Sequence, residues 1–267
     1  MVDGAFNQMA VDYDDVFTNS RIGELQREKV SQYINQNIQL GKNIRVLELN
    51  CGTGEDALRF AQEGCKTTAT DISSEMLNVA RNKAEKADFS SLIEFEILDI
   101  EAIQEHKLEH KYDLVFSNFG GLNCVTQSGL AKLSTAMKSI LNPNGRFVAV
   151  VMPDKCLMES IYFVLKLQLG KAFRRGNKKV EWINDTGESV MIYYYSPKEF
   201  QSVFEEVFSL EAKLPVGLWI PPSYTEQFFQ RYPCILAFLS RLENTCSPSF
   251  TSRISDHYLI DLKIKNG

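Results

Sequence analysis

The feature that most constrains the fold is a strand, a tight turn and a helix that follow one another between residues 44 and 61. Residues 44–49 form an apolar run that predicts a buried parallel strand. Gly52 and Gly54 then predict a tight turn in which no Cβ keeps the backbone away from a ligand. The residues that open the following amphipathic helix are Ala57, Leu58, Phe60 and Ala61. Such a unit places a ligand at the carboxyl end of a strand in an α/β sheet.

The charge of this turn bears on which ligand it binds. Residues 52–57 also match the dinucleotide fingerprint, with alanine at its third position. A dinucleotide places its pyrophosphate at the amino end of the helix, where Glu55 and Asp56 would repel it. S-adenosylmethionine carries an ammonium and a sulfonium and no phosphate, so these carboxylates, with Glu48, favour it. The alternative for Glu55 and Asp56 is that they only complement the helix dipole, whereas Glu48 lies inside an apolar strand.

Residues 46–54 resemble the first motif of the class I S-adenosylmethionine-dependent methyltransferases. Their usual pattern is acidic-x-Gly-x-Gly-x-Gly, and Asn50 stands here in place of the first glycine. Asparagine tolerates left-handed backbone angles better than most residues, so the turn is expected to survive. The resemblance extends over residues 6–152. It implies a three-layer α/β Rossmann-like fold with a mostly parallel seven-stranded sheet, and cofactor contacts at Glu48, Asn50, Cys51, Gly52 and Gly54.

A second strand, residues 66–70, is predicted to end at Asp71. Asp71 follows Glu48 by 23 residues, close to the spacing expected for a carboxylate that accepts both ribose hydroxyls. A carboxylate suits two hydroxyl donors because it has two acceptor oxygens. Ile72 and Met76 would then lie beside the adenine. The alternative is that Asp71 caps the helix that starts near Ser73.

A third strand is predicted over residues 93–97, where apolar side chains alternate with glutamates, and it leads to Asp99 and Ile100. The resemblance implies that an acidic residue here accepts a hydrogen bond from the adenine amino group, and Asp99 fits. The alternative is an aspartate that starts a turn at the end of the strand.

The fourth strand, residues 112–117, runs into Asn118, Phe119 and Gly120, and the reacting methyl group is expected above this loop. Methyltransferases that act on the amines of nucleic-acid bases often carry Asn-Pro-Pro-Tyr or a relative of it here. Phe119 and Gly120 replace those prolines, so DNA base methylation is disfavoured. Asn118 is expected near the methionine moiety, and Gly120 with Gly121 permits close approach of cofactor or acceptor.

Residues 6–17 predict an apolar helical stripe that includes Tyr13. The segment resembles the start of many small-molecule methyltransferases, in which the leading helix closes over the cofactor. Tyr13 would then contact the cofactor. The alternative is a helix that simply packs on the core.

The remaining pattern predicts a helix at 126–141, a turn at 142–145 and a fifth strand at 146–152, which gives alternating strands and helices in three layers. Beyond residue 153 we expect a helix at 154–170, a hairpin at 180–195, a helix from Pro197 and a closing strand at 258–264. The expected units are lid helices at 1–40, a cofactor-binding core at 41–152, an inserted α+β substrate cap at 153–195 and a sheet-completing, substrate-covering segment at 196–267.

Composition limits the partners. A net charge of −5 and a pI near 5.4 argue against nucleic acid, and no run reaches the roughly 20 apolar residues of a membrane helix. We therefore expect neither a nucleic-acid nor a membrane partner. The basic cluster at residues 171–179 is interpreted as a solvated loop face. Six cysteines without metal-type spacing indicate buried thiols in a reducing cytoplasm, and no metal site is expected.

The sequence thus predicts an S-adenosylmethionine-dependent methyltransferase that acts on an oxygen, nitrogen or carbon of a small molecule. Of the 29 aromatic residues, 18 follow residue 154, which favours an apolar or aromatic acceptor. No catalytic base is assigned; if one exists, it is expected to be a Tyr or His of the cap. The alternatives are an NAD(P)-dependent oxidoreductase and a non-catalytic protein that binds S-adenosylmethionine. Oligomeric state is left open.

Overall fold

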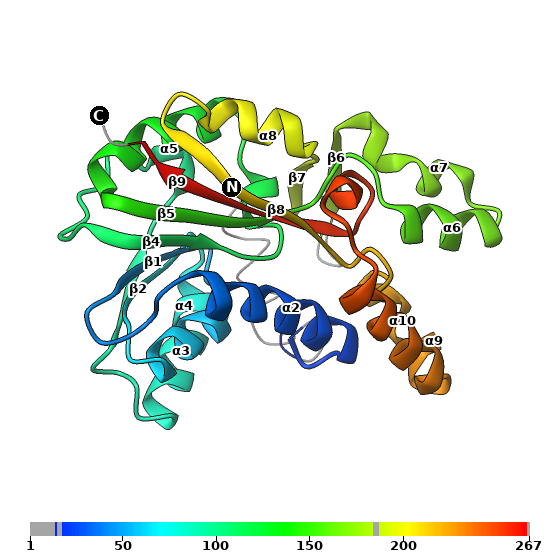
Figure 1. Cartoon of the computed structure of the whole chain (residues 1–267), viewed down its shortest axis with the longest axis horizontal. Coiled ribbons are helices and arrows are strands. Elements are labelled where there is room, and N and C mark those ends of the chain that lie inside the picture. The colour runs from blue at the N-terminus through cyan, green and yellow to red at the C-terminus, as the bar shows by residue number, and fades with distance from the viewer. Residues whose placement is uncertain (1–13, 15–17, 184–186, 266–267) are drawn as a thin grey trace.

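The computed structural model describes residues 14, 18–183 and 187–265, and its centre is a seven-stranded sheet covered by helices on both faces (Figure 1). The strand order is β3-β2-β1-β4-β5-β9-β8. The strands are β1 (Arg45–Leu49), β2 (Lys66–Asp71), β3 (Ile93–Ile97), β4 (Tyr112–Ser117), β5 (Leu141–Val151), β8 (Phe208–Val216) and β9 (His257–Ile264).

The first five strands are parallel to one another, and β9 is antiparallel to both β5 and β8. The carboxyl ends of β1 to β5 therefore lie along one edge of the sheet, which is where ligands bind in open α/β sheets. The predicted α/β class, with a mostly parallel sheet of seven strands, is confirmed. The register is firm because the strand side chains alternate between two buried clusters: Val46 packs on one face and Leu47 on the other.

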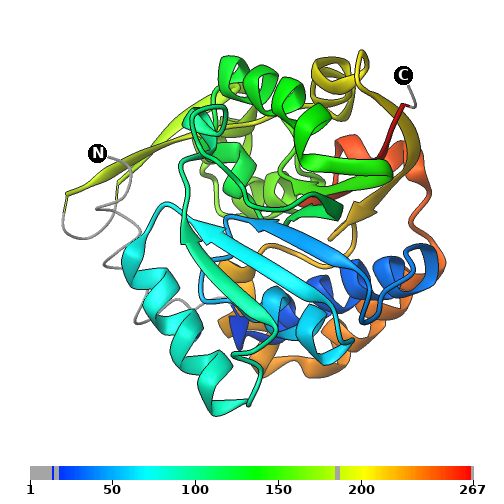
Figure 2. The ribbon, with the colours of Figure 1, turned by 90° about the vertical axis from the view of Figure 1, so that its left-hand side faces the viewer.

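Helices from different parts of the chain cover the two faces. One face carries α2 (Arg21–Asn37), α3 (Glu55–Gln62) and α4 (Ser74–Lys86). The other carries α5 (Gln127–Ile140) and α8 (Pro197–Phe204), as Figure 2 shows. Three of them, α2, α4 and α5, begin at side-chain caps: Ser20, Ser73 and Thr126 each accept a hydrogen bond from the backbone N–H three residues on.

The helical part of the cap differs from the predicted single helix, whereas its predicted hairpin is confirmed. The single helix expected at 154–170 is two helices, α6 (Leu157–Leu165) and α7 (Leu169–Ala172), separated at Leu167, whose φ of 57° is incompatible with a continuous helix. The hairpin consists of β6 (Lys179–Ile183) and β7 (Ser189–Tyr193), which form a separate two-stranded sheet. The turn expected before the fifth strand lies within β5 as an irregularity in its pairing with β4.

A last pair of helices, α9 (Glu226–Arg231) and α10 (Pro233–Thr245), lies between β8 and β9 in the chain. It lies at the same end of the molecule as α6 and α7 (Figure 1). The rings of Tyr162 and Phe163 in α6 each lie 5.6 Å from that of Tyr224, just before α9. The cap and this helix pair are therefore in direct contact.

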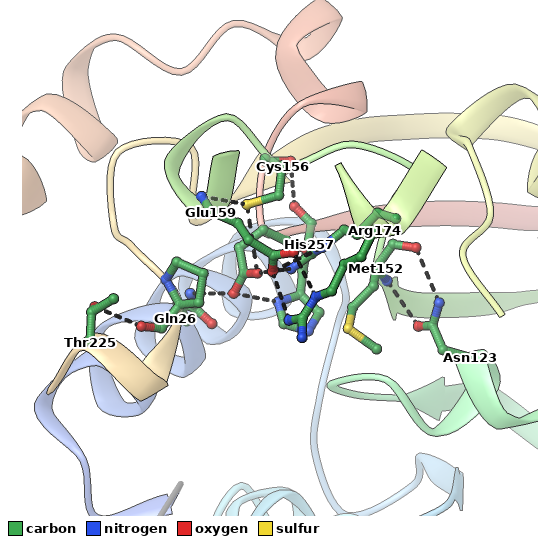
Figure 3. A network of polar contacts seen from close by, with 12 residues as sticks. Gln26, Asn123, Met152, Cys156, Glu159, Arg174, Thr225 and His257 are labelled. Carbon is green, nitrogen blue, oxygen red and sulfur yellow. Dashed lines mark hydrogen bonds and ion pairs between the residues drawn. The ribbon is translucent and has the colours of Figure 1, made fainter. Parts of the chain in front are cut away.

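The interpretation of residues 171–179 as a solvated face is wrong for its central member. Arg175 is 5% exposed and donates hydrogen bonds to Glu159 and to Asp256, while Arg174 also pairs with Glu159. Figure 3 shows this network around Glu159 and His257. Burial raises the pKa of the Asp256 carboxyl, but His257 and Arg175 lower it more, so it stays well below its usual range. The cluster therefore fastens the cap to the sheet through buried ion pairs.

The six cysteines are all free thiols. Cys51, Cys65 and Cys156 are buried, but Cys234 and Cys246 are exposed, so the expectation of buried thiols is wrong for these two. Within the described part of the chain, no helix has both the length and the apolar content to cross a bilayer. Among those same residues no group of His, Cys, Asp or Glu is arranged to hold a metal ion.

Candidate active site

A cavity of about 330 Å³ lies at the carboxyl ends of the parallel strands. The predicted cofactor residues that line it are Glu48, Asn50, Cys51, Gly52, Asp71, Ile72, Met76, Asp99, Ile100, Asn118, Phe119 and Gly120. Gly54 is not among the lining residues, and Tyr13 lies outside the described residues. The structure therefore brings together the side chains that follow four successive parallel strands.

The two glycines of the turn have different roles. Gly52, with φ of 53°, lines the cavity, and its N–H donates to the Asp71 carboxylate at 2.9 Å. Gly54 has φ of 80° and precedes α3, where a Cβ would lie 2.7 Å from the Cβ of Ala80 in α4. Gly54 thus permits close packing of two helices, and it is Gly52 that leaves room for a ligand.

Asn50 replaces a glycine and joins two loops. Its φ of 51° is left-handed, as expected. Its Oδ1 accepts from the Ser117 hydroxyl at 2.6 Å, and its Nδ2 donates to the Asn118 carbonyl at 3.0 Å. A Cβ on Gly121 would lie 2.0 Å from the Asn50 Cγ, so Gly121 leaves the space that the asparagine side chain fills. The side chain that departs from the usual pattern therefore ties the end of β1 to the end of β4.

Asp71 is buried and held by backbone donors. The N–H groups of Gly52 and Ser73 each donate to one of its carboxylate oxygens at 2.9 Å. Burial raises the pKa of this carboxyl, and the two N–H groups offset part of the rise. Ser73, whose hydroxyl accepts from the N–H of Met76, caps α4, so the alternative that Asp71 is the cap is wrong. Each Asp71 oxygen retains a lone pair for a ligand hydroxyl.

Asp99 is exposed at the rim of the cavity. Its Oδ1 accepts from the N–H of Glu101 and so begins a short 3₁₀ helix, η2 (Ile100–Ala102). The alternative of an aspartate that starts a turn is therefore confirmed. Its other oxygen has no bond to this turn, and a contact with adenine stays a prediction.

Glu48 carries the most unusual carboxylate of the cavity. It is 2% exposed, and its Oε2 has no hydrogen-bond partner among the described residues. Burial, followed by the charge of Asp56, raises its pKa well above the usual value. A buried polar oxygen without a partner costs free energy, and a cation placed beside it would favour the ionised carboxylate. The ammonium of S-adenosylmethionine is such a cation.

The charge of the whole cavity is strongly acidic. Among the residues that the structure describes, its lining includes six carboxylates and a single guanidinium, that of Arg27. Arg27 forms an ion pair with Asp56, which also accepts from the Asn118 amide at 2.8 Å, and Glu55 lies 3.5 Å from Lys83. Asp56 is therefore bonded to neighbouring side chains and does more than complement the helix dipole. A ligand with phosphate groups would still meet an excess of negative charge.

Two parts of the site were missed in the sequence. Arg27 lies in α2, 5.2 Å from the ring centre of Phe119, and nothing in the pattern of that helix marks it. Asp14 accepts from the Thr53 hydroxyl at 2.7 Å and pairs with Lys83 at 2.5 Å. These bonds connect Asp14 with the glycine turn and with α4. The signal that could have found Asp14 is the Tyr-Asp pair at residues 13 and 14.

The other end of the cavity is apolar and reaches the cap. Cys124, Val125, Met152 and Ile192 line it, none of which the sequence singled out. A Cβ on Gly120 would lie 3.2 Å from the Met152 methyl, so this glycine keeps the space open. The Asn123 amide donates to the carbonyls of Met152 and Tyr193, at 3.1 and 2.6 Å. That amide holds β7, and with it Ile192, at the cavity.

The Tyr or His expected as a catalytic base is not among the described residues of the lining. Among the described residues, the cavity wall contains no His, Tyr or Lys. His257 lies behind it, with its ring edge-on to Phe119 at 5.4 Å and its Nδ1 3.2 Å from Asp256. It is a residue of β9, outside the cap, and no catalytic residue is assigned.

Comparison with known proteins agrees with this geometry. The family model described as "Methyltransferase domain" matches residues 40–207, more than half of the chain. A demethylmenaquinone methyltransferase of Bacillus licheniformis is 24% identical over 214 residues, which span 77% of this chain and 86% of that protein. A non-reducing polyketide synthase of Penicillium roqueforti is 28% identical over 144 residues, which span 49% of this chain but only 6% of the synthase.

The fold has close counterparts among solved structures. An S-adenosylmethionine-dependent methyltransferase from Clostridium acetobutylicum superposes with a TM-score of 0.61 and 15% identity, covering 98% of this chain and 99% of that one. The fold and the cavity define a class I methyltransferase with a Rossmann-like sheet. The chain belongs to the methyltransferase-domain family and is an enzyme that uses S-adenosylmethionine as its methyl donor.

Proposed function

We propose that this enzyme methylates a small, apolar and aromatic molecule. The observation that carries the proposal is the division of the cavity. Carboxylates line the end formed by β1, β2 and β3, whereas Phe119, Val125, Met152 and Ile192 line the end formed by β4, β5 and the cap. The acidic end suits the cationic cofactor, which leaves the apolar end for the acceptor.

In the proposed cofactor site, each acidic residue has its own partner. Asp71 accepts from the ribose hydroxyls, Glu48 from the ammonium, and Asp99 from the adenine amino group. Asn118 and Gly120 lie where the methyl group leaves. The orphaned Glu48 oxygen and the backbone-braced Asp71 support this arrangement. When bound, S-adenosylmethionine supplies an electrophilic methyl group, and the protein's own contribution is alignment and exclusion of water.

For the acceptor we propose a quinone-type or phenolic ring that is methylated at carbon. The wall near Gly120 offers apolar contacts and no His, Tyr or Lys among the described residues, so the acceptor itself must supply an electron-rich atom. An electron-rich ring carbon meets this condition with little help from a base. The name of the Bacillus licheniformis relative, a demethylmenaquinone methyltransferase, supports an acceptor of this chemistry.

The proposal assigns a role to each of the four units that the sequence predicts. Residues 1–40 close over the cofactor, and the contacts of Asp14 with Thr53 and Lys83 support that placement. Residues 41–152 bind the cofactor. Residues 153–195 cover the acceptor, which the position of Ile192 supports, and residues 196–267 complete the sheet. We propose the cytoplasm as the compartment, because all six thiols are free.

The test is a transfer assay with tritiated S-adenosylmethionine and a panel of acceptors matched in size. A reduced naphthoquinone, a phenol and an aliphatic amine present a ring carbon, an oxygen and a nitrogen. The proposal predicts label on the ring carbon of the naphthoquinone and little on the amine. Label that appears only on the amine or on the phenol oxygen would contradict carbon methylation of an aromatic acceptor.

A second assay tests the two alternative functions, an NAD(P)-dependent oxidoreductase and a non-catalytic protein that binds S-adenosylmethionine. Calorimetric titration with S-adenosylhomocysteine should show binding, and titration with NADH should not, because the acidic lining disfavours phosphate. Cofactor binding without transfer to any aromatic acceptor would count against the proposed acceptor class. It would leave the cofactor site intact.

A further inference from the structure

The helix α6 of the cap carries apolar side chains on its outward face as well as the buried Phe163 on its inward face. Its inward face carries the buried carboxylate of Glu159, neutralised by Arg174 and Arg175. Its outward face carries Ile161, Val164 and Leu165, at the spacing that places them on one side of a helix. A helix whose outward side carries apolar side chains has a face that water does not favour.

The exposed apolar surface continues past the end of α6. Leu165 is 78% exposed, Leu167 is 88% exposed, and Leu169 and Phe173 follow at 60% and 66%. We call the six side chains of Ile161, Val164, Leu165, Leu167, Leu169 and Phe173 the cap patch. Single exposed apolar residues are common, but a contiguous group of this kind marks an interaction surface.

Basic residues alternate in the sequence with those of the cap patch. Residues 155–179 contain seven Lys and Arg and one acidic residue, the buried Glu159, in a chain whose net charge is −5. Lys155, Lys166, Lys171 and Lys179 are exposed there. The surface charge of this segment is therefore wholly positive, in contrast with the rest of the chain.

The helix pair α9 and α10 exposes further apolar side chains at the same end of the molecule (Figure 1). Phe228, Tyr232 and Phe238 are at least half exposed. Together the two helices contain two arginines and two glutamates, Glu226 and the buried Glu243. The contact of Tyr224 with Tyr162 and Phe163 joins this pair to the cap.

We propose that the cap patch, together with α9 and α10, docks this enzyme on the surface of an anionic phospholipid bilayer. Apolar side chains bordered by lysines match an interface whose acyl layer is apolar and whose headgroups are negative. Leu165, Leu167 and Phe173 enter the boundary between headgroups and chains, and Lys166 and Lys171 contact the phosphates. The docking requires no spanning helix and no particular methyl acceptor.

Charge favours a bilayer over a second copy of the chain. A symmetric dimer through the cap patch would place the same lysines against one another, and like charges at a contact are unfavourable. An anionic surface instead complements every exposed charge of residues 155–179. The expectation of no membrane partner rested on the lack of a spanning segment, and surface docking is a different mode of binding.

The experiment measures flotation of the full chain with vesicles of phosphatidylcholine, either alone or mixed with phosphatidylglycerol. The wild-type chain should float with the mixed vesicles, and added salt should release it. Replacing Leu165→Ser together with Leu167→Ser should weaken binding at least tenfold. Replacing Lys166→Gln together with Lys171→Gln should weaken binding to the mixed vesicles about fivefold for each lysine.

The matched control is Leu210→Ser, an exposed leucine on β8 far from the cap in the chain, which should float like the wild type. Thermal unfolding of each variant shows that the fold is kept. The proposal would be overturned if the wild-type chain floated with neither kind of vesicle. A serine variant that floats unchanged would also overturn it, as would a sedimentation experiment in which the wild type dimerises and the serine variant does not.

Discussion

The two ends of the cavity are built in different ways. The cofactor end takes Glu48, Asp71 and Asp99 from the ends of three neighbouring parallel strands, each within a few residues of its strand. The acceptor end takes Met152 from the residue after β5 and Ile192 from the cap, held together by the Asn123 amide. The first end is fixed by the sheet, whereas the second depends on how the cap is fastened to it. Cofactor binding and acceptor binding should therefore respond to different substitutions.

The largest expected effect comes from loosening the cap. Replacing Arg175→Ala would leave Glu159 with only Arg174 and weaken the neutralisation of Asp256, both buried. Breaking a buried ion pair in this way should lower the free energy of unfolding by about 3–5 kcal/mol. Denaturant unfolding measures it. The control is Lys171→Ala, an exposed cation nearby, which should change stability by less than about 0.5 kcal/mol. Equal effects of the two would show that the network does not fasten the cap.

At the cofactor end, replacing Glu48→Gln removes the negative charge that the carboxylate would carry opposite the ammonium of the cofactor. No hydrogen bond of Oε2 is lost, because this oxygen has no partner among the described residues. A hydrogen bond to a charged group contributes about 1.5–3 kcal/mol, so affinity for S-adenosylhomocysteine should fall roughly 10-fold to 100-fold. Calorimetry measures the loss, and Glu94→Gln, an exposed glutamate of β3, is the control. Unchanged affinity would remove Glu48 from the proposed site.

At the acceptor end, replacing Ile192→Lys places a charge against the apolar wall. The ratio kcat/KM for an aromatic acceptor should fall about tenfold or more, because a buried apolar contact is replaced by a group that must stay hydrated. Affinity for S-adenosylhomocysteine should stay the same. Ile183→Lys, on β6 of the same hairpin but away from the cavity, is the matched control. Loss of cofactor affinity in the Ile192 variant would show that the two ends are not separate.

The smallest effect concerns pH. The pKa of Glu48 is raised by burial, so the folded enzyme without cofactor holds a proton that the unfolded chain has lost above the usual glutamate pKa. Stability of the free enzyme should therefore decline as pH rises through that window. The Glu48→Gln variant should show a shallower decline, to which the raised pKa of Asp71 still contributes, and should be more stable than the wild type at neutral pH. Melting curves over pH measure it, and parallel profiles for the two proteins would contradict the assigned cause.

Much of the fold and of the cofactor end could be predicted from the sequence because each depends on local patterns. The apolar run ending at Glu48 and the strand ending at Asp71 mark their own strand ends, and a parallel sheet brings such ends together. Arg175 could not be placed in this way. Its partners Glu159 and Asp256 are 16 and 81 residues away, and a run of basic residues looks the same whether it is solvated or paired.

The acceptor end of the cavity and the role of Gly54 could not be predicted for the same reason: the contacts join residues that lie far apart in the chain. Ile192 lies at the cavity because the carbonyl of the neighbouring Tyr193 accepts a hydrogen bond from Asn123, 70 residues away in the chain. No periodicity in the sequence predicts such a bond. Gly54 was assigned to the ligand because glycine turns often approach one, yet its neighbour is Ala80 of the next helix. Asn50 shows the converse: its left-handed backbone was predictable, whereas its bonds to Ser117 and Asn118 required the sheet order.

The most direct test of the divided cavity is a crystal structure of the enzyme with S-adenosylhomocysteine. We predict that the ribose hydroxyls lie on the Asp71 carboxylate, that the ammonium reaches the Glu48 Oε2, and that the sulfur faces the apolar space beside Gly120 and Met152. A bound ligand that leaves Glu48 without a partner and fills the space against Met152 and Ile192 would contradict the account.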